Sequence, residues 1–191
     1  VELCSRFLET LATIAPTYVI LGNHDGNLKN ASRQDALTPI AIALKNPDLH
    51  LLKNSGETKL DDKFSLNVLS VFDRDNWRAP NGDNEINIAL YHGAISNSST
   101  DLGWVMEHGE DDISIFKGHD FAFLGDIHKT NQILDHDGRI RYAGSTVQQN
   151  HGETNDKGFL IWDIKSKDDF TCKHVVLKNP KPFITIELTP K

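Results

Sequence analysis

Apolar positions recur along the chain at two spacings, one typical of helices and one typical of strands. Residues 1–15 carry apolar side chains at helical spacing, and Pro16 ends the predicted helix. A second helix is expected over residues 36–45, with Pro39 in its first turn. The short apolar run at 17–21 lies between these helices and predicts a strand buried on both faces.

Further strands follow in the rest of the chain. Residues 64–72 alternate at period two, which predicts Leu66 and Val68 on one face. A hairpin is predicted over 131–145, with its turn at Asp137-Gly138. The other strands are expected at 49–55, 85–93, 120–128, 158–164 and 171–178. The first half therefore has an α/β pattern and the second half a mostly antiparallel one, which favours one α/β domain with two sheets.

Polar residues gather where three of these strands end beside a glycine. They are Asn23, His24 and Asp25 after the first strand, His92 at the end of 85–93, and Asp126 and His128 at the end of 120–128. Ligands tend to lie beyond the carboxyl ends of strands in α/β sheets. Amide oxygen, imidazole and carboxylate suit Mn²⁺, Fe²⁺ or Zn²⁺, and two such ions can activate water and stabilise a phosphoryl transition state.

Each strand end also has an ordinary structural interpretation. Asn23 is a common turn residue, and an isolated buried histidine such as His92 more often satisfies core hydrogen bonds. Asp126 could cap a helix, with His128 exposed beside it. The recurrence of one pattern at three separate strand ends favours a metal site over three unrelated structural roles.

Composition narrows the class of protein. The 191 residues are 38% hydrophobic, which is enough for a substantial core. The formal net charge of −7 excludes a general electrostatic attraction to nucleic acid, so metals or local cations must attract a phosphate substrate. The two cysteines, Cys4 and Cys172, predict reduced thiols and a cytoplasmic location. No apolar run is long enough to predict a membrane span.

Aromatic and basic residues outside the strand ends have plainer expectations. Trp77, Trp104 and Trp162 could stack on nucleic-acid bases, but packing in the core or in loops is the favoured interpretation. Arg139 and Arg141 share one face of the predicted hairpin and could meet a DNA backbone. A solvated face is the favoured interpretation for these two arginines.

Three short motifs, "GNHD", "YHG" and "GDIH", resemble in this order the later motifs of the calcineurin-like metallophosphoesterases. The segment "RYAGSTVQQNHGETNDKGFLIWDI" is similar to the one that closes the nuclease domain in SbcD-like DNA repair exonucleases. Those exonucleases work with a coiled-coil, SMC-type ATPase. The resemblance covers nearly the whole chain and implies a four-layer α/β/β/α sandwich with two mixed sheets.

The resemblance also implies a role for each strand-end residue. Asn23 and His92 would bind one metal, and His128 would bind the other. Asp126 stands where the family usually has histidine and is kept as a ligand, because a carboxylate can replace imidazole on Mn²⁺. His24 would contact the phosphate and protonate the leaving oxygen, with Asp25 orienting it; these are the two catalytic residues that the resemblance implies.

Two motifs of the family, D-x-H and G-D-x-x-[DN], come before GNHD and supply three ligands, including a bridging aspartate. Only 22 residues precede Asn23 here, so residues 1–191 are expected to be a partial nuclease domain without its first strand–helix portion. The DNA-contacting cap of the family is also expected to be absent. Two divalent ions, Mn²⁺ before Fe²⁺ or Zn²⁺, are expected in the complete protein, and one or none in this piece, which would be inactive alone.

Three functions remain open at this point. The first is a metal-dependent phosphodiesterase, a DNA exonuclease with DNA and an SMC-type ATPase as partners, homodimeric when complete. The second is a metallophosphoesterase that acts on a small phosphoester. The third is a non-catalytic interaction module with the same fold, although loss of function would be expected to erase some of the ligand residues.

Overall fold

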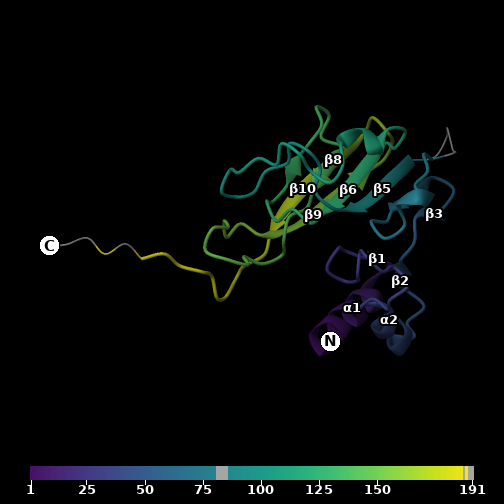
Figure 1. Cartoon of the computed structure of the whole chain (residues 1–191), viewed down its shortest axis with the longest axis horizontal. Helices are drawn as coiled ribbons and strands as arrows, with labels where there is room; N and C mark the ends of the chain where they lie inside the picture. The colour runs from purple at the N-terminus through teal and green to yellow at the C-terminus, as the bar shows by residue number, and fades with distance from the viewer. Residues whose placement is uncertain (81–85, 187, 189–191) are drawn as a thin grey trace. The chain divides into compact units, whose positions relative to one another are not determined.

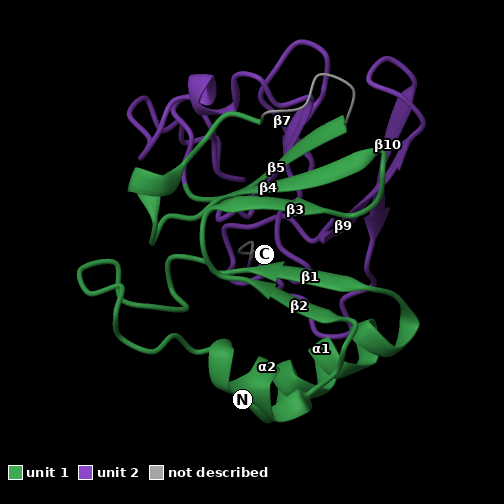
Figure 2. Ribbon diagram, turned by 90° about the vertical axis from the view of Figure 1, so that its right-hand side faces the viewer, with its two compact units in different colours: residues 1–93 green, residues 94–191 purple. Residues whose placement is uncertain are grey.

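The chain divides into two compact units, Val1–Gly93 (unit 1) and Ala94–Lys191 (unit 2), coloured green and purple in Figure 2. The computed structural model describes residues 1–80, 86–186 and 188. The first residue of the predicted strand 85–93 therefore lies outside the described residues. Each unit is described separately below.

Unit 1 begins with two helices and two strands that alternate along the chain. They are α1 (Glu2–Ile14), β1 (Thr17–Ile20), α2 (Thr38–Leu44) and β2 (Leu49–Leu52). The strands β1 and β2 pair in parallel, and both helices lie along the same side of this pair (Figure 1). Pro39 stands in the first turn of α2, as predicted. The prediction that β1 is buried on both faces is wrong, because every residue of β1 is only half-buried in this two-stranded sheet.

Three more strands complete unit 1, joined by a short 3₁₀ helix. They are β3 (Gly56–Lys59), β4 (Phe64–Leu69) and β5 (Ile86–His92), with the 3₁₀ helix at Arg74–Asn76. The strand β4 pairs antiparallel with β3 and parallel with β5, so this is a mixed arrangement. Because β5 contacts β1, unit 1 has helices, a first sheet and a second set of strands in successive layers (Figure 2).

The strand β4 is buried on both faces, so polar residues are buried together with Leu66 and Val68, which alternate with them. Ser65 and Asn67 are both buried, and each finds a polar partner on a neighbouring strand. The Ser65 hydroxyl donates to Glu57 Oε1 at 2.8 Å, and Asn67 Nδ2 donates to Asn87 Oδ1 at 3.4 Å. Hydrogen bonding within the sheet thus offsets the cost of burying these polar groups.

In residues 94–186 and 188, unit 2 consists of strands and loops with one short 3₁₀ helix, Ile113–Phe116. Its strands are β6 (Phe121–Gly125), β7 (Gln132–Ile133), β8 (Ile140–Tyr142), β9 (Gly158–Ile164) and β10 (Phe170–Val176). The predicted turn is confirmed, since Gly138 has a φ of +74° that favours glycine. The expectation of mostly antiparallel strands holds for β7–β8 and β9–β10, but β6 pairs with β8 in parallel.

Aromatic rings of the β9–β10 hairpin cover the two hairpin arginines. Trp162 of β9 stacks on Phe123 of β6 with ring centroids 4.8 Å apart, which confirms its packing role. Arg141 lies over Trp162 at 5.3 Å, and Arg139 lies over Phe170 at 5.6 Å. The prediction of a solvated face is wrong here, because the guanidinium groups pack on aromatic faces that arrive from later in the chain.

The mixture of helices with parallel and antiparallel strands confirms the α/β class. Parallel and antiparallel strand pairs both occur among the described strands of each unit. In the part of the chain that the structure describes, no helix has the length and apolar character needed to cross a membrane.

Candidate functional site

The loop after β1 is closed by its own backbone and by Asp25. Asp25 N–H donates to Gly22 O at 2.9 Å, and Gly22 N–H donates to Asp25 Oδ2 at 2.8 Å. The carbonyl of Asp25 also accepts from Ala36 N–H at 2.7 Å, which joins this turn to the segment before α2. The Asp25 carboxylate therefore holds the turn, and His24 stands exposed at its tip.

His92 meets this loop at Gly22. A Cβ atom at residue 22 would lie 2.8 Å from His92 Nε2, so only glycine leaves room for the imidazole ring at its present position. The next residue is Asn23, whose side-chain Oδ1 is buried from solvent. His92 is the last residue of β5, and the structure thus brings the ends of β1 and β5 together within unit 1.

An open hollow of about 620 Å³ lies beside the same loop. Its lining comes from residues 23–29 and 33–36 and includes His24 and Asp25. Asp35 lies in this lining, and its carboxylate contacts Lys53 Nζ at 2.8 Å. Burial raises the pKa of Asp35, but hydrogen bonds from Lys53 and Thr38 outweigh it and hold this pKa well below the usual aspartate range.

The strand end after β6 in unit 2 is shaped by side chains. Asp126 has a φ of +96°, a left-handed conformation that is uncommon outside glycine and that costs about 1–3 kcal/mol. Two residues later, His128 Nδ1 lies 2.9 Å from Glu153 Oε1. A carboxylate at Nδ1 favours the imidazole tautomer with its proton there, which leaves the Nε2 lone pair for a metal or a proton.

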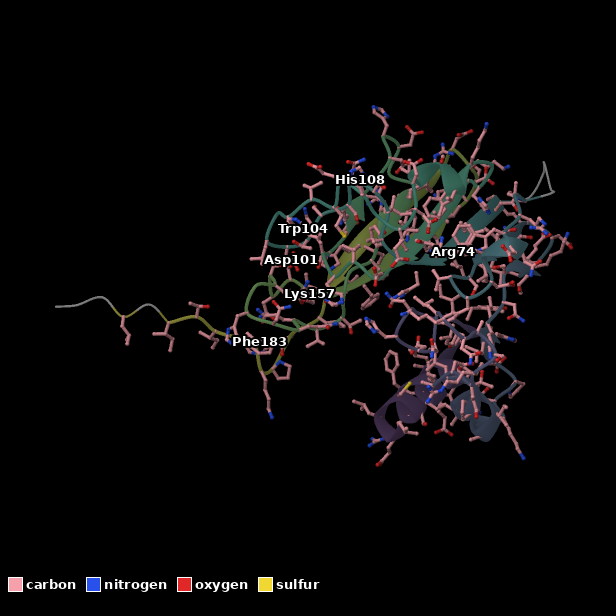
Figure 3. The ribbon with its side chains drawn as sticks, in the orientation of Figure 1. Arg74, Asp101, Trp104, His108, Lys157 and Phe183 are labelled. Carbon is pink, nitrogen blue, oxygen red and sulfur yellow. The ribbon has the colours of Figure 1, made fainter. Side chains whose placement is uncertain are left out.

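A buried lysine joins this strand end to two carboxylates. Lys157 is 1% exposed, and its Nζ donates to Asp101 Oδ2 at 2.6 Å and to His128 O at 2.7 Å. The same Nζ lies 3.5 Å from Glu153 Oε2. Figure 3 shows Asp101 and Lys157 close together, with Trp104 in the same region of unit 2.

The charge on Glu153 is stabilised by this arrangement. Burial raises the pKa of Glu153, but the hydrogen bonds from Gln149 N–H and His128 and the charge of Lys157 outweigh it. The Glu153 pKa therefore lies below its ordinary value, and the side chain is a carboxylate at neutral pH.

A pocket of about 410 Å³ opens beside His128. One part is apolar, with the exposed side chains of Leu102 and Trp104. Its remaining lining is Thr100, Asp101, Asp126, Ile127, His128, Lys129, Asn150, Gly152 and Glu153. The pocket thus combines a flat aromatic surface with the strand-end residues, a combination typical of sites that bind a small organic group.

Sequence reasoning missed Asp101, Glu153 and Lys157. Glu153 and Lys157 stand in "GETNDKG", a stretch that reads as a solvated loop because it is rich in charged and turn-forming residues. The spacing of four between Glu153 and Lys157 is too common in sequences to indicate burial. Lys157 contacts Asp101, over fifty positions earlier in the chain, and Glu153 contacts Lys157.

The six predicted site residues fall into both units. Asn23, His24, Asp25 and His92 belong to unit 1, and Asp126 and His128 belong to unit 2. Convergence of Asn23, His92 and Asp126 stays a prediction. Across residues 1–80, 86–186 and 188, no group of three or more His, Cys, Asp or Glu side chains could hold a metal. The amide, imidazole and carboxylate donors at the three strand ends are nevertheless types that suit a divalent ion of the Mn²⁺ type.

No family model matches the sequence. The chain is 35% identical over 200 residues to "Uncharacterized protein R555" of Acanthamoeba polyphaga mimivirus. This similarity covers 98% of the chain and 14% of the viral protein, so the chain spans about one seventh of that relative's length.

Proposed function

We propose that the chain is part of a metal-dependent phosphodiesterase of the SbcD-like exonuclease type, with the four-layer sandwich of that class. The observation that carries this proposal is the hydrogen bond between His128 Nδ1 and Glu153. His128 lies two residues after Asp126. Metal-ligating histidines are commonly held in this way by a carboxylate. The contact of His92 with Gly22, next to Asn23, gives the proposal support from unit 1.

Each proposed ligand would act through a definite donor atom. Asn23 would offer its amide oxygen and His92 an imidazole nitrogen to one divalent ion. His128 would offer Nε2 to the other, and Asp126 would offer a carboxylate oxygen as a further ligand. Bound Mn²⁺, or Fe²⁺ or Zn²⁺, would lower the pKa of a water and offset the charge on a phosphoryl group.

His24 would donate a proton to the leaving oxygen. It is exposed at the tip of a turn and lines the open hollow, so a phosphate could reach it. The hydrogen bond from Gly22 N–H to Asp25 fixes the turn on which His24 stands. Asp25 would accordingly orient His24 through the backbone.

The pocket beside His128 favours a nucleic-acid substrate over a small phosphoester. Its volume of about 410 Å³ and the exposed ring of Trp104 suit a nucleobase, and aromatic stacking is worth about 1–3 kcal/mol per base. DNA is therefore the proposed substrate of the full-length protein. An SMC-type coiled-coil ATPase and a second copy of the protein are its proposed partners.

The test compares two substrates with the full-length protein in Mn²⁺. We expect hydrolysis of linear DNA, slowed by about 10² or more in His92→Ala and His128→Ala, because a bound metal would be lost. His136→Ala is the matched control, since the His136 side chain is fully exposed. Hydrolysis of nitrophenyl phosphate alone would favour the small-phosphoester function. Failure to hydrolyse either substrate would contradict both enzymatic functions and favour the non-catalytic interaction module.

A further inference from the structure

The tautomer of His128 is set by its surroundings. A neutral imidazole carries its proton on either Nδ1 or Nε2, and a hydrogen-bond acceptor at one nitrogen selects the proton there. Glu153 Oε1 lies 2.9 Å from Nδ1, while the ring itself is 44% exposed. The arrangement therefore selects the Nδ1–H form while the His128 ring stays partly exposed to solvent.

Glu153 is itself held in one position by several donors. Asn150 Nδ2 donates to Oε1 at 2.9 Å, and Gln149 N–H donates to Oε2 at 2.9 Å. Lys157 Nζ lies 3.5 Å from Oε2 and also donates to the backbone oxygen of His128. The same ammonium group thus contacts both the carboxylate that orients the ring and the backbone that carries it.

The number of buried charges makes this arrangement unusual for a loop. The side chains of Asp101 and Glu153 are 6% and 8% exposed, and one buried ammonium group, that of Lys157, faces both. Burying charged groups is costly unless they are paired and hydrogen-bonded. Such a network keeps its members in one geometry, because displacement of Lys157 would leave two buried carboxylates without their cation.

We infer that Glu153 is a positioning residue that fixes His128 as the Nδ1–H tautomer and directs its Nε2 lone pair away from the loop. The tautomer follows from geometry alone. The further consequence, a Mn²⁺ ligand at Nε2, rests on the proposed function. Loss of such a partner typically weakens metal binding by about 10- to 100-fold.

The first experiment records long-range ¹H–¹⁵N correlations of the histidine rings in the metal-free chain at about pH 8, where an ordinary histidine is neutral. We expect His128 to show a protonated Nδ1 and an unprotonated Nε2. A wild-type spectrum with the proton on Nε2 would overturn the inference without any variant. Assignment uses His128→Gln, which removes one ring from the spectrum.

The second experiment replaces Glu153 by methionine, which leaves Lys157 paired with Asp101. We expect the His128 signals to change to those of a mixture of tautomers. Asp137→Ala is the matched control, because Asp137 contacts Nδ1 of the exposed His136 at 3.1 Å and should leave His128 unchanged. A folded Glu153→Met chain with His128 still held as Nδ1–H would contradict the inference.

Mn²⁺ titration separates this inference from the proposed function. If both are right, Glu153→Met lowers Mn²⁺ affinity by about 10- to 100-fold. If the tautomer is as expected but the wild-type chain shows no Mn²⁺ binding that depends on His128, Glu153 still positions His128 and the metal assignment fails. If Mn²⁺ binds through His128 with the same affinity in Glu153→Met, the positioning role toward the metal fails.

Discussion

The strand ends of the two units present similar residues but are built by different means. After β1, the turn is made by backbone hydrogen bonds, Asp25 and the space that Gly22 leaves for His92. After β6, the geometry depends on a buried network in which Lys157 joins Asp101 and Glu153 beside His128. Space and backbone set the first end, and buried charge sets the second.

This difference predicts how each end responds to substitution. A network of buried charges is sensitive to the loss of any member, because the remaining charges cannot be solvated where they lie. A turn closed by backbone hydrogen bonds tolerates changes of exposed side chains, but it is sensitive at the position where a Cβ atom has no room. The following substitutions test each half of the comparison.

The largest effect is expected for Lys157→Met. It leaves Asp101 and Glu153 as buried carboxylates without their cation, so the free energy of unfolding should fall by about 3–5 kcal/mol. Chemical denaturation of the chain measures this change. Lys165→Met is the control, because Lys165 is 67% exposed and its contact with Asp169 at 3.9 Å should contribute about 0–1 kcal/mol. Equal losses in the two variants would mean that the buried network does not stabilise unit 2.

His24→Ala addresses the exposed tip of the first turn. Turnover of DNA by the full-length protein should slow by about 10² or more, since a positioned general acid contributes a factor of that order. Mn²⁺ affinity and the free energy of unfolding should stay nearly unchanged, because His24 is exposed and outside the proposed ligand set. Mn²⁺ titration and DNA hydrolysis kinetics on the same preparation distinguish a general acid from a metal ligand. Loss of metal together with unchanged turnover per bound metal would make His24 a ligand.

The success of the sequence-based predictions also differs between the strand ends and the buried network. The strand ends were predictable, because an apolar run followed by glycine and then by Asn23 or Asp126 is a pattern of neighbouring residues. The network was not, because Glu153 and Lys157 look like loop residues until Asp101 is placed beside them. The partial burial of Arg141 depends similarly on Trp162, which belongs to a later strand.

Local patterns also misjudged burial within the sheets. The strand β3 was missed because Gly56–Lys59 contains no large apolar residue, and it forms through pairing with β4. Ser65 and Asn67 are polar residues of β4, yet both are buried with partners on adjacent strands. In each case, tertiary contacts override the preference that a single segment shows.

Gly22→Ala tests the importance of space at the first strand end. The new Cβ would lie 2.8 Å from His92 Nε2, so the ring must move, at a cost of about 1–3 kcal/mol in unfolding free energy. If His92 binds metal, Mn²⁺ affinity should fall by about tenfold or more, since ligand geometry would be lost. Gly26→Ala is a matched control in the same loop, because its Cβ would meet Phe72 at 2.9 Å. Similar Mn²⁺ affinities in the two variants would exclude His92 from the ligand set.

The smallest effect is expected for Asp35→Asn, which removes one charge from the backbone-built end. Asp35 Oδ1 accepts from Leu37 N–H and Thr38 N–H, and asparagine can keep these bonds while losing the ion pair with Lys53. We expect a loss of about 1 kcal/mol in unfolding free energy at pH 7, the usual net size for an intramolecular hydrogen bond.

The effect of Asp35→Asn should depend on pH in a definite direction. Burial raises the pKa of Asp35, yet the bonds from Lys53 and Thr38 lower it further, so the folded-state pKa lies below that of the unfolded chain. The stabilisation is therefore complete above the unfolded aspartate pKa of about 3.9 and declines as the pH falls below it. Denaturation of wild type and Asp35→Asn at pH 7, 4 and 3 should show the difference shrinking on acidification. A difference that stays constant or grows at low pH would mean that the Asp35 charge does not stabilise the segment between the first turn and α2.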